Sequence, residues 1–205
     1  MRFNIFTLIF LLLSNRAQAL TASDLKTGDV LLQSVPCYIC SLIEIEEGAP
    51  YSHSGVAWVA NDGSVSMNEV WVDVDQIPLS DFLAKRKAQT QTLVLRAIAN
   101  DGSDFVIDPE SLQTLFNQNF LGHSYDEDFL WNNSDSKGEM YYCSELIAKL
   151  LNYFLPNPIT TKPMHFTHYR EDWIKYFHGT PPDGQPGLSP ADFTTMKQFR
   201  TVGEI

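Results

Sequence analysis

The chain has 205 residues, of which 25 are acidic and 14 are basic, and its net charge is −11 at neutral pH. This acidic composition, with no basic stripe in the sequence, excludes a protein that only binds nucleic acid and disfavours binding to anionic membranes. With 44% hydrophobic residues the chain can bury a substantial core, and its length predicts about one domain.

The N-terminus has the pattern of a secretory signal peptide. Arg2 supplies a positive charge, residues 5–13 are almost entirely apolar, and residues 17–19 (Ala-Gln-Ala) offer small side chains where a signal peptidase reads them. The apolar run is too short to span a bilayer. We therefore expect residues 1–19 to be removed and residues 20–205 to be exported as a single domain, to the periplasm if the source is a Gram-negative bacterium.

Four segments have the alternation or the apolar composition of β-strands. They are residues 29–34, 54–60, 65–74 and 92–98. Between the second and the third, Asn61-Asp62-Gly63 is typical of a hairpin turn.

Several helices are expected around these strands. Ser80 is placed to cap a short helix that runs to residue 87, and another short helix is expected at residues 171–177. Asp108 followed by Pro109 is a strong helix start, and this helix is expected to end at Gly122. Strands first, with helices at either end, predict an α+β fold with an antiparallel sheet rather than a parallel one.

A cysteine begins the most strongly amphipathic segment. Its apolar residues recur with the spacing of one helix face. They are Cys143, Leu146, Ile147, Leu150, Leu151 and Phe154. Pro156 and Pro158 then stop the helix, since neither can donate the next backbone hydrogen bond. In the first turn a thiol lies beside free N–H groups that favour the thiolate, so we interpret Cys143 as a nucleophile rather than as a small buried residue.

The other two cysteines, Cys37 and Cys40, are close enough in sequence to form a disulfide in an oxidising compartment. A thioredoxin-like redox pair is the alternative. That motif needs a strand that leads into a helix opening with the pair, and the sequence does not predict such a helix here. A structural disulfide, or none, is therefore favoured.

The hairpin allows strand pairing to be predicted. If its loop has three residues, with Gly63 in the left-handed conformation that closes it, Ala57 faces Met67, and His53 and Glu69 become diagonal neighbours on one face. A loop of two residues would send this histidine and carboxylate to opposite faces. The other face would carry apolar side chains of the core, namely Val56, Trp58, Val70, Val72 and Val74.

A histidine held by a carboxylate has a defined function beside a thiol. The imidazole takes the thiol proton and stabilises the thiolate, while the carboxylate orients the ring. Attack on a carbonyl then gives an acyl-enzyme that water or another nucleophile resolves, and the amide of Cys143 is a natural oxyanion donor. These patterns do not themselves bring Cys143 to His53, and Asp73 is a rival of Glu69 for the orienting role.

Several segments resemble the motifs of NlpC-type papain-like hydrolases. They are residues 28–32 (GDVLL), 52–56 (SHSGV) and 142–146 (YCSEL). The histidine precedes the cysteine, the reverse of papain, as in the circularly permuted YaeF/YiiX group, which is distantly related to lecithin–retinol acyltransferase. Residues 122–126 (GHSYD) and 186–193 (PGLSPADF) are similar to further segments of that group.

The resemblance implies a permuted papain-like fold with the nucleophile at a helix N-terminus. Carried over residue by residue, it implies Cys143 as nucleophile, His53 as base and Glu69 as the orienting residue. Tyr125 matches a family tyrosine near the pocket, and Tyr125 and Tyr142 are the candidate substrate-binding residues.

Together these features predict an exported cysteine hydrolase that cleaves an amide, either a peptidoglycan-type peptide or another amide, through an acyl-thioester. The alternatives are an ester or lipid acyl hydrolase or acyltransferase, with an apolar entrance formed by Phe116, Phe120 and Phe129, and a catalytically idle binding module. No cofactor or metal is expected, because His165 and His168 lack the spacing of a zinc site. The expected partner is a peptide, amide or acyl substrate, with no nucleic acid and no stable insertion into a membrane.

Overall fold

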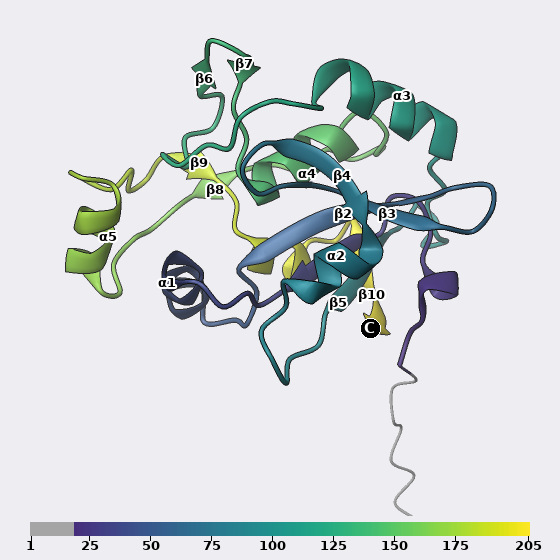
Figure 1. Cartoon of the computed structure of the whole chain (residues 1–205), viewed down its shortest axis with the longest axis horizontal. Coiled ribbons are helices and arrows are strands. Elements are labelled where there is room, and N and C mark those ends of the chain that lie inside the picture. The colour runs from purple at the N-terminus through teal and green to yellow at the C-terminus, as the bar shows by residue number, and fades with distance from the viewer. Residues whose placement is uncertain (1–18) are drawn as a thin grey trace, which may run out of the picture.

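The computed structural model describes residues 19–205, and its main feature is a six-stranded antiparallel sheet (Figure 1). The strands are β1 (Val30–Gln33), β2 (His53–Val59), β3 (Val65–Val70), β4 (Val74–Pro78), β5 (Leu93–Ala97) and β10 (Phe199–Glu204). They lie in the order β10-β5-β1-β2-β3-β4. The expected signal peptide lies outside the described residues except for Ala19.

Five α-helices accompany the sheet in the described part of the chain, which confirms the predicted α+β class. They are α1 (Tyr38–Glu47), α2 (Leu79–Ala84), α3 (Pro109–Asn119), α4 (Cys143–Leu151) and α5 (Arg170–Tyr176). Two 3₁₀ helices, η1 (Ala22–Asp24) and η2 (Pro190–Thr195), and two small strand pairs, β6 (Ser134–Asp135) with β7 (Gly138–Glu139) and β8 (Lys162–Pro163) with β9 (Pro186–Gly187), complete the chain. Within residues 19–205, no helix is both long enough and apolar enough to cross a bilayer.

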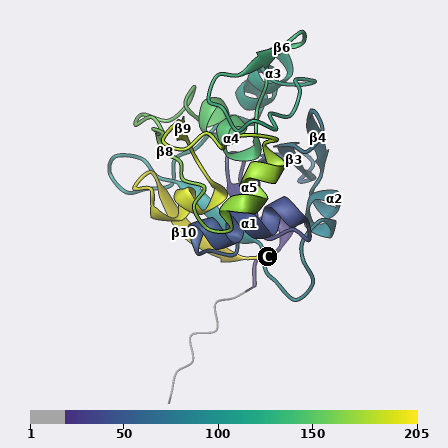
Figure 2. The same ribbon diagram turned by 90° about the vertical axis from the view of Figure 1, so that its left-hand side faces the viewer.

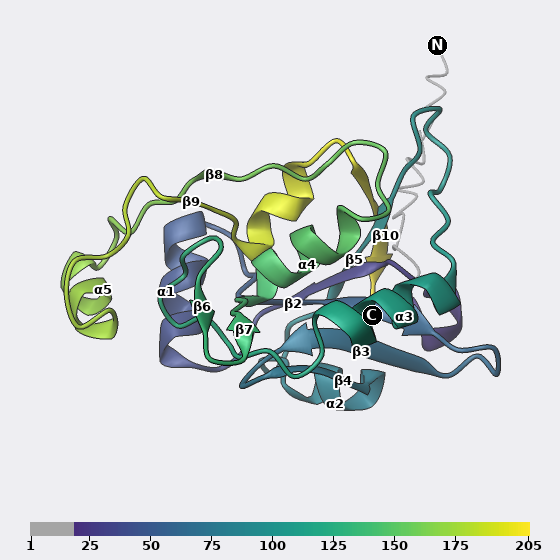
Figure 3. The same cartoon turned by 90° about the horizontal axis from the view of Figure 1, so that it is seen from above.

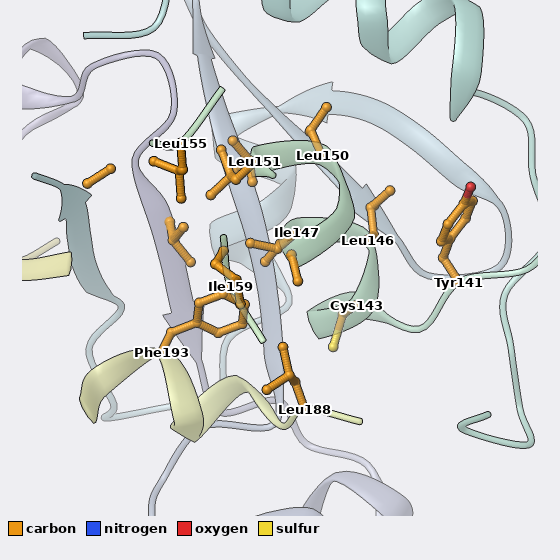
Figure 4. Close-up of a cluster of buried hydrophobic side chains, with 14 of the residues drawn as sticks. Tyr141, Cys143, Leu146, Ile147, Leu150, Leu151, Leu155, Ile159, Leu188 and Phe193 are labelled. Atoms are coloured by element: carbon orange, nitrogen blue, oxygen red, sulfur yellow. The ribbon is translucent and has the colours of Figure 1, made fainter. Parts of the chain in front are cut away.

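Helices cover both faces of the sheet, with α4 on one side and α2 on the other (Figure 3). Side chains that alternate along β1 divide between the two layers: Val30 and Leu32 pack with α4, whereas Leu31 packs with Phe82 of α2. Figure 4 shows the first layer, where the apolar face of α4 meets Phe193 of η2. This double cover fixes α4, and with it the cysteine at its start, against the centre of the sheet.

The predicted hairpin is confirmed in both loop and register. Ala57 pairs with Met67, Ala60 donates its N–H to the carbonyl of Ser64, and Gly63 has a φ of 84°. A residue with a side chain is strained in that left-handed conformation, which explains the glycine. The three-residue loop therefore sets which face every residue of β2 and β3 presents.

The expected strand at residues 65–74 is in fact two strands. β3 ends at Val70, a tight turn follows, and β4 returns antiparallel, so that Val70 pairs with Val74. Val72 lies in this turn with 72% of its surface exposed, and its predicted place in the core is wrong. The alternating pattern hid the turn because its residues include no glycine or proline.

Several helix boundaries also differ from those predicted. Ser80 does not cap α2, which begins at Leu79 and ends at Ala84 rather than at residue 87, and its hydroxyl instead donates to Asp81. Asp108 does cap α3, accepting the N–H of Ser111, but that helix ends at Asn119, before Gly122. The last turn of α4 ends at Leu151, ahead of the prolines. There the Asn152 side chain bonds both the N–H and the carbonyl of Ile159 and turns the chain back.

Helix α1 is the element that the sequence did not predict. It follows β1 after a short connection, Cys37 is its N-cap, and Gly48 ends it with a φ of 62°. Cys37 and Cys40 form a disulfide in its first turn. A helix does open with this pair, so the expectation that none would is wrong. Figure 2 shows α5 beside α1, and Asp172 of α5 lies close enough to Tyr38 of α1 to raise the pKa of its hydroxyl.

Candidate active site

Cys143 is the first residue of α4, and its side chain is almost completely buried. Figure 4 shows its sulfur at the N-terminal end of the helix, where first-turn N–H groups have no acceptor within the helix. Burial alone raises the pKa of this thiol, but the hydrogen bond and positive charge of His53 outweigh burial, so the pKa lies below its usual value. Cys143 is the free cysteine of the three.

His53 and Glu69 form a buried pair. The imidazole Nε2 lies 2.6 Å from Oε2 of the carboxylate, and each side chain is at most 3% exposed. Since Glu69 occupies Nε2, Nδ1 is the ring nitrogen that remains available to Cys143, which lies close enough to His53 to change its pKa. Burial lowers the pKa of His53, but Cys143 and Glu69 more than reverse this and raise it to about 9. The three side chains therefore favour an imidazolium beside a thiolate.

Lys85 binds the second oxygen of the Glu69 carboxylate. Burial raises the pKa of Glu69, but His53 first and Lys85 second keep it below its usual value. The Lys85 ammonium also lies 5.0 Å from the centre of the Trp71 ring, and Trp71 in turn packs edge-on against His53 at 5.1 Å. No local pattern in the sequence points to Lys85, because only the return of the chain through β4 and α2 brings it to β3.

Ser54 is a second residue that sequence reasoning missed. Its hydroxyl is buried without a hydrogen-bond partner of ordinary geometry, yet it lies close enough to Cys143 to favour the thiolate. Ser54 precedes Gly55 on β2, directly beside His53. Its position beside His53 is the available signal, but neighbouring residues of a strand face opposite sides of the sheet, so strand alternation alone does not predict that both lie near one site.

Asp73 does not lie in the orienting position. Its carboxylate pairs with Lys137 at 2.7 Å, and both side chains are about half exposed. Its backbone bridges to Ser124. Of the two carboxylates that the sequence offered, the structure brings Glu69 to His53.

A largely apolar pocket opens beside Cys143. Tyr125 and Tyr142, the candidate substrate-binding residues, both line it, and α1 contributes Ile43. Aromatic and thioether side chains make up much of the remaining wall, namely Phe129, Met164, Phe166 and Trp173. The Tyr142 hydroxyl accepts the N–H of Leu188 at 3.1 Å, so that this tyrosine also holds the segment that covers one side of the pocket.

The apolar entrance expected from three phenylalanines is only partly observed. Phe129 lines the pocket, where it stacks on Tyr176 with ring centres 5.6 Å apart. Phe116 and Phe120 instead lie in the core between α3 and α4 and do not reach the pocket. Their helical spacing matched a core face as well as an entrance, and burial of α3 against the sheet decided between the two.

His165 and His168 lie in different surroundings. His165 lines the pocket, whereas His168 is exposed and contacts Glu46 at 3.4 Å. Among residues 19–205, no group of three or more histidine, cysteine or acidic side chains is arranged to hold a metal ion. The described residues therefore offer no donor set that fits a bound metal.

Comparisons with known proteins agree with this fold. A crystal structure described as the metalloprotein YiiX from Escherichia coli O157:H7 superposes with a TM-score of 0.72 and 21% identity, covering 88% of this chain and 97% of that one. No curated protein sequence matches the chain significantly. The profile of the permuted papain-like amidase family YaeF/YiiX, C92, matches residues 24–203. The chain belongs to this family of permuted papain-like amidases.

Proposed function

We propose that this protein is a cysteine amidase in which Cys143 is the nucleophile, His53 the base and Glu69 the residue that orients the imidazole. The observation that carries the proposal is the buried hydrogen bond of 2.6 Å between His53 and Glu69, which leaves the other ring nitrogen to Cys143. A thiolate beside an imidazolium is the reactive state of such a site.

The reaction follows from this arrangement. The Cys143 thiolate attacks the amide carbonyl, and N–H groups in the first turn of α4 are placed to receive the developing oxyanion. The His53 imidazolium then protonates the departing amine, which leaves an acyl-thioester on Cys143. Water attacks the thioester as the imidazole of His53 removes its proton, and the carboxylic acid and free thiolate are released.

The pocket favours a substrate with an apolar acyl portion. Its polar side chains on α1 are already engaged: Glu46 accepts the N–H groups of Thr167 and His168, and Glu47 pairs with Lys162. These carboxylates would have to give up partners to bind a charged peptide terminus. We therefore place an amide with an apolar acyl group ahead of a peptidoglycan-type peptide as the substrate, and we retain export through residues 1–19 as part of the proposal.

The same apolar wall supports a second candidate, hydrolysis or transfer of an acyl group from a lipid ester. A thioester on Cys143 would form from either substrate. Amide cleavage stays first because the family to which the chain belongs is described as amidases.

The test compares acetyl and octanoyl p-nitroanilides with the matched p-nitrophenyl esters and with a peptidoglycan-type peptide. Each rate is divided by the uncatalysed rate of the same compound, because the esters are intrinsically more reactive. We expect a higher kcat/KM for octanoyl than for acetyl anilide, by roughly tenfold or more, and complete loss in Cys143→Ala. Higher relative rates for esters would support the second candidate. Equal activity of wild type and Cys143→Ala on every compound would refute both.

A further inference from the structure

The position of the Cys37–Cys40 disulfide suits thiol–disulfide exchange better than stabilisation of the fold. It lies within the first turn of α1 and joins two residues three apart, so it links no separate elements of the fold. A disulfide restricts the unfolded chain less as the loop it closes becomes shorter, and a loop of this size is near the minimum. Bracing the fold is therefore a weak reason for the bond.

The two cysteines differ in exposure. Cys37 is the N-cap of α1 and is partly exposed, between exposed Pro36 and a Tyr38 that is 57% exposed, whereas Cys40 is only 5% exposed. Cys37 is thus the residue of the pair that an incoming thiolate can approach from solvent. Attack at one defined sulfur is a requirement for directed thiol–disulfide exchange.

The helix start also stabilises the product of that attack. The N–H of Cys40 already donates to the Cys37 sulfur at 3.1 Å, and Cys37 has the extended backbone of an N-cap. After reduction the same N–H faces the Cys37 thiolate, together with the positive end of the α1 dipole. Both effects favour the reduced form of the pair and so make the disulfide easier to reduce.

We infer that Cys37 and Cys40 form a reactive disulfide, a second chemical site on this chain, which exchanges with a dithiol. A thiolate of the dithiol attacks Cys37, forming a mixed disulfide and releasing Cys40 as a thiolate that takes up a proton. The second thiol of the dithiol, as its thiolate, then attacks the dithiol's other sulfur, which is bonded to Cys37. This closes the dithiol's disulfide and releases the Cys37 thiolate. The protein pair gains two electrons, and the dithiol becomes a disulfide.

The first test measures how fast the bond is reduced. Full-length Cys143→Ala protein, in which Cys37 and Cys40 supply the only thiols, is treated with excess dithiothreitol, both folded and in concentrated urea. Samples are quenched in acid, alkylated and mapped by mass spectrometry. We expect the folded protein to be reduced at least as fast as the unfolded chain. Reduction of the folded protein roughly tenfold slower would show a protected structural bond and overturn the inference.

A second test identifies the sulfur that reacts. In the same Cys143→Ala background, Cys40→Ser leaves Cys37 free and Cys37→Ser leaves Cys40 free. With glutathione disulfide we expect Cys37 to form the mixed disulfide roughly tenfold faster than Cys40. Equal rates, or faster reaction of Cys40, would contradict the assignment. Circular dichroism shows whether each variant is folded. If one variant does not fold, the rate of reduction of the Cys143→Ala protein decides the inference. Neither test depends on the amidase proposal, because both use protein without Cys143.

Discussion

His53 and Glu69 are 16 residues apart in sequence, yet the imidazole Nε2 and the carboxylate Oε2 lie 2.6 Å apart in the folded protein. The hairpin closed by Gly63 places them on one face of β2 and β3. Lys85 binds the other carboxylate oxygen, and Cys143 lies close enough to His53 to raise the pKa of its imidazole. Positive and negative groups thus alternate, from the partly exposed ammonium of Lys85 through the Glu69 carboxylate and the His53 imidazolium to the buried Cys143 thiolate. Each group favours the charged form of the next one.

The carboxylate of Glu69 can be tested by Glu69→Gln. The amide keeps the shape but loses the charge that holds the imidazolium, so kcat/KM should fall by about 100-fold or more. The matched control is Asp73→Asn, which removes the rival carboxylate from its exposed pair with Lys137 and should leave kcat/KM unchanged. If kcat/KM instead fell in Asp73→Asn and not in Glu69→Gln, the orienting role would belong to Asp73.

Lys85→Met tests the ion pair between Lys85 and the Glu69 carboxylate. Without the ammonium, the pKa of the buried Glu69 carboxylate should rise. A protonated Glu69 no longer stabilises the His53 imidazolium, and through it the Cys143 thiolate, so the acid limb of the pH–rate profile should move to higher pH. The free energy of unfolding should fall by roughly 1 to 3 kcal/mol, because a buried charged acceptor loses a partner. Lys85→Arg should restore much of the profile.

The control for that variant is Lys137→Met. It removes an exposed lysine from an exposed ion pair, so unfolding should change by less than about 1 kcal/mol and the pH profile should not move. If Lys85→Met shifts only the urea midpoint and leaves the pH profile in place, Lys85 supports the fold and not the ionisation of the site.

The pH dependence of kcat/KM should be bell-shaped. The rate rises as Cys143 loses its proton, at a pKa below its usual value because His53 stabilises the thiolate. It falls as the pH passes about 9, where the His53 imidazolium loses the proton needed by the leaving amine. An alkaline limb near the ordinary histidine value of 6.5 would contradict this assignment.

Gly63→Ala tests the turn that sets the register. A methyl group at this position meets no atom within 4 Å, so the cost comes from the left-handed backbone alone. We expect the free energy of unfolding to fall by about 1 to 2 kcal/mol, measured by urea denaturation, while kcat/KM per folded molecule stays the same. A large loss of kcat/KM in folded protein would mean that the hairpin had changed register.

The sequence predicted the parts of the site that follow from local periodicity. The cysteine at the start of α4 followed from helical spacing, and the neighbouring placement of His53 and Glu69 followed from a loop of three residues. The meeting of Cys143 with His53 depends on α4 packing across β2 and required the family resemblance. Lys85 required the path through β4 and α2, which no local pattern encodes.

The misplaced elements have a common cause. Helix α1 was missed because its exposed and buried residues do not separate into a clear stripe, and its N-cap is a cysteine rather than one of the usual polar caps. The turn at Val72 was missed because alternation continues through a tight reversal. In both places tertiary contacts, and not local preference, determine the structure.

The thiolate–imidazolium pair is tested most directly by alkylation of Cys143 with limiting iodoacetamide at mildly acidic pH, followed by peptide mass mapping, in wild type and His53→Ala. We expect fast labelling of Cys143 in wild type, because the thiolate is already present, and a collapse of that rate in the variant. Slow labelling in both proteins would show a buried, unactivated thiol and contradict the proposed site.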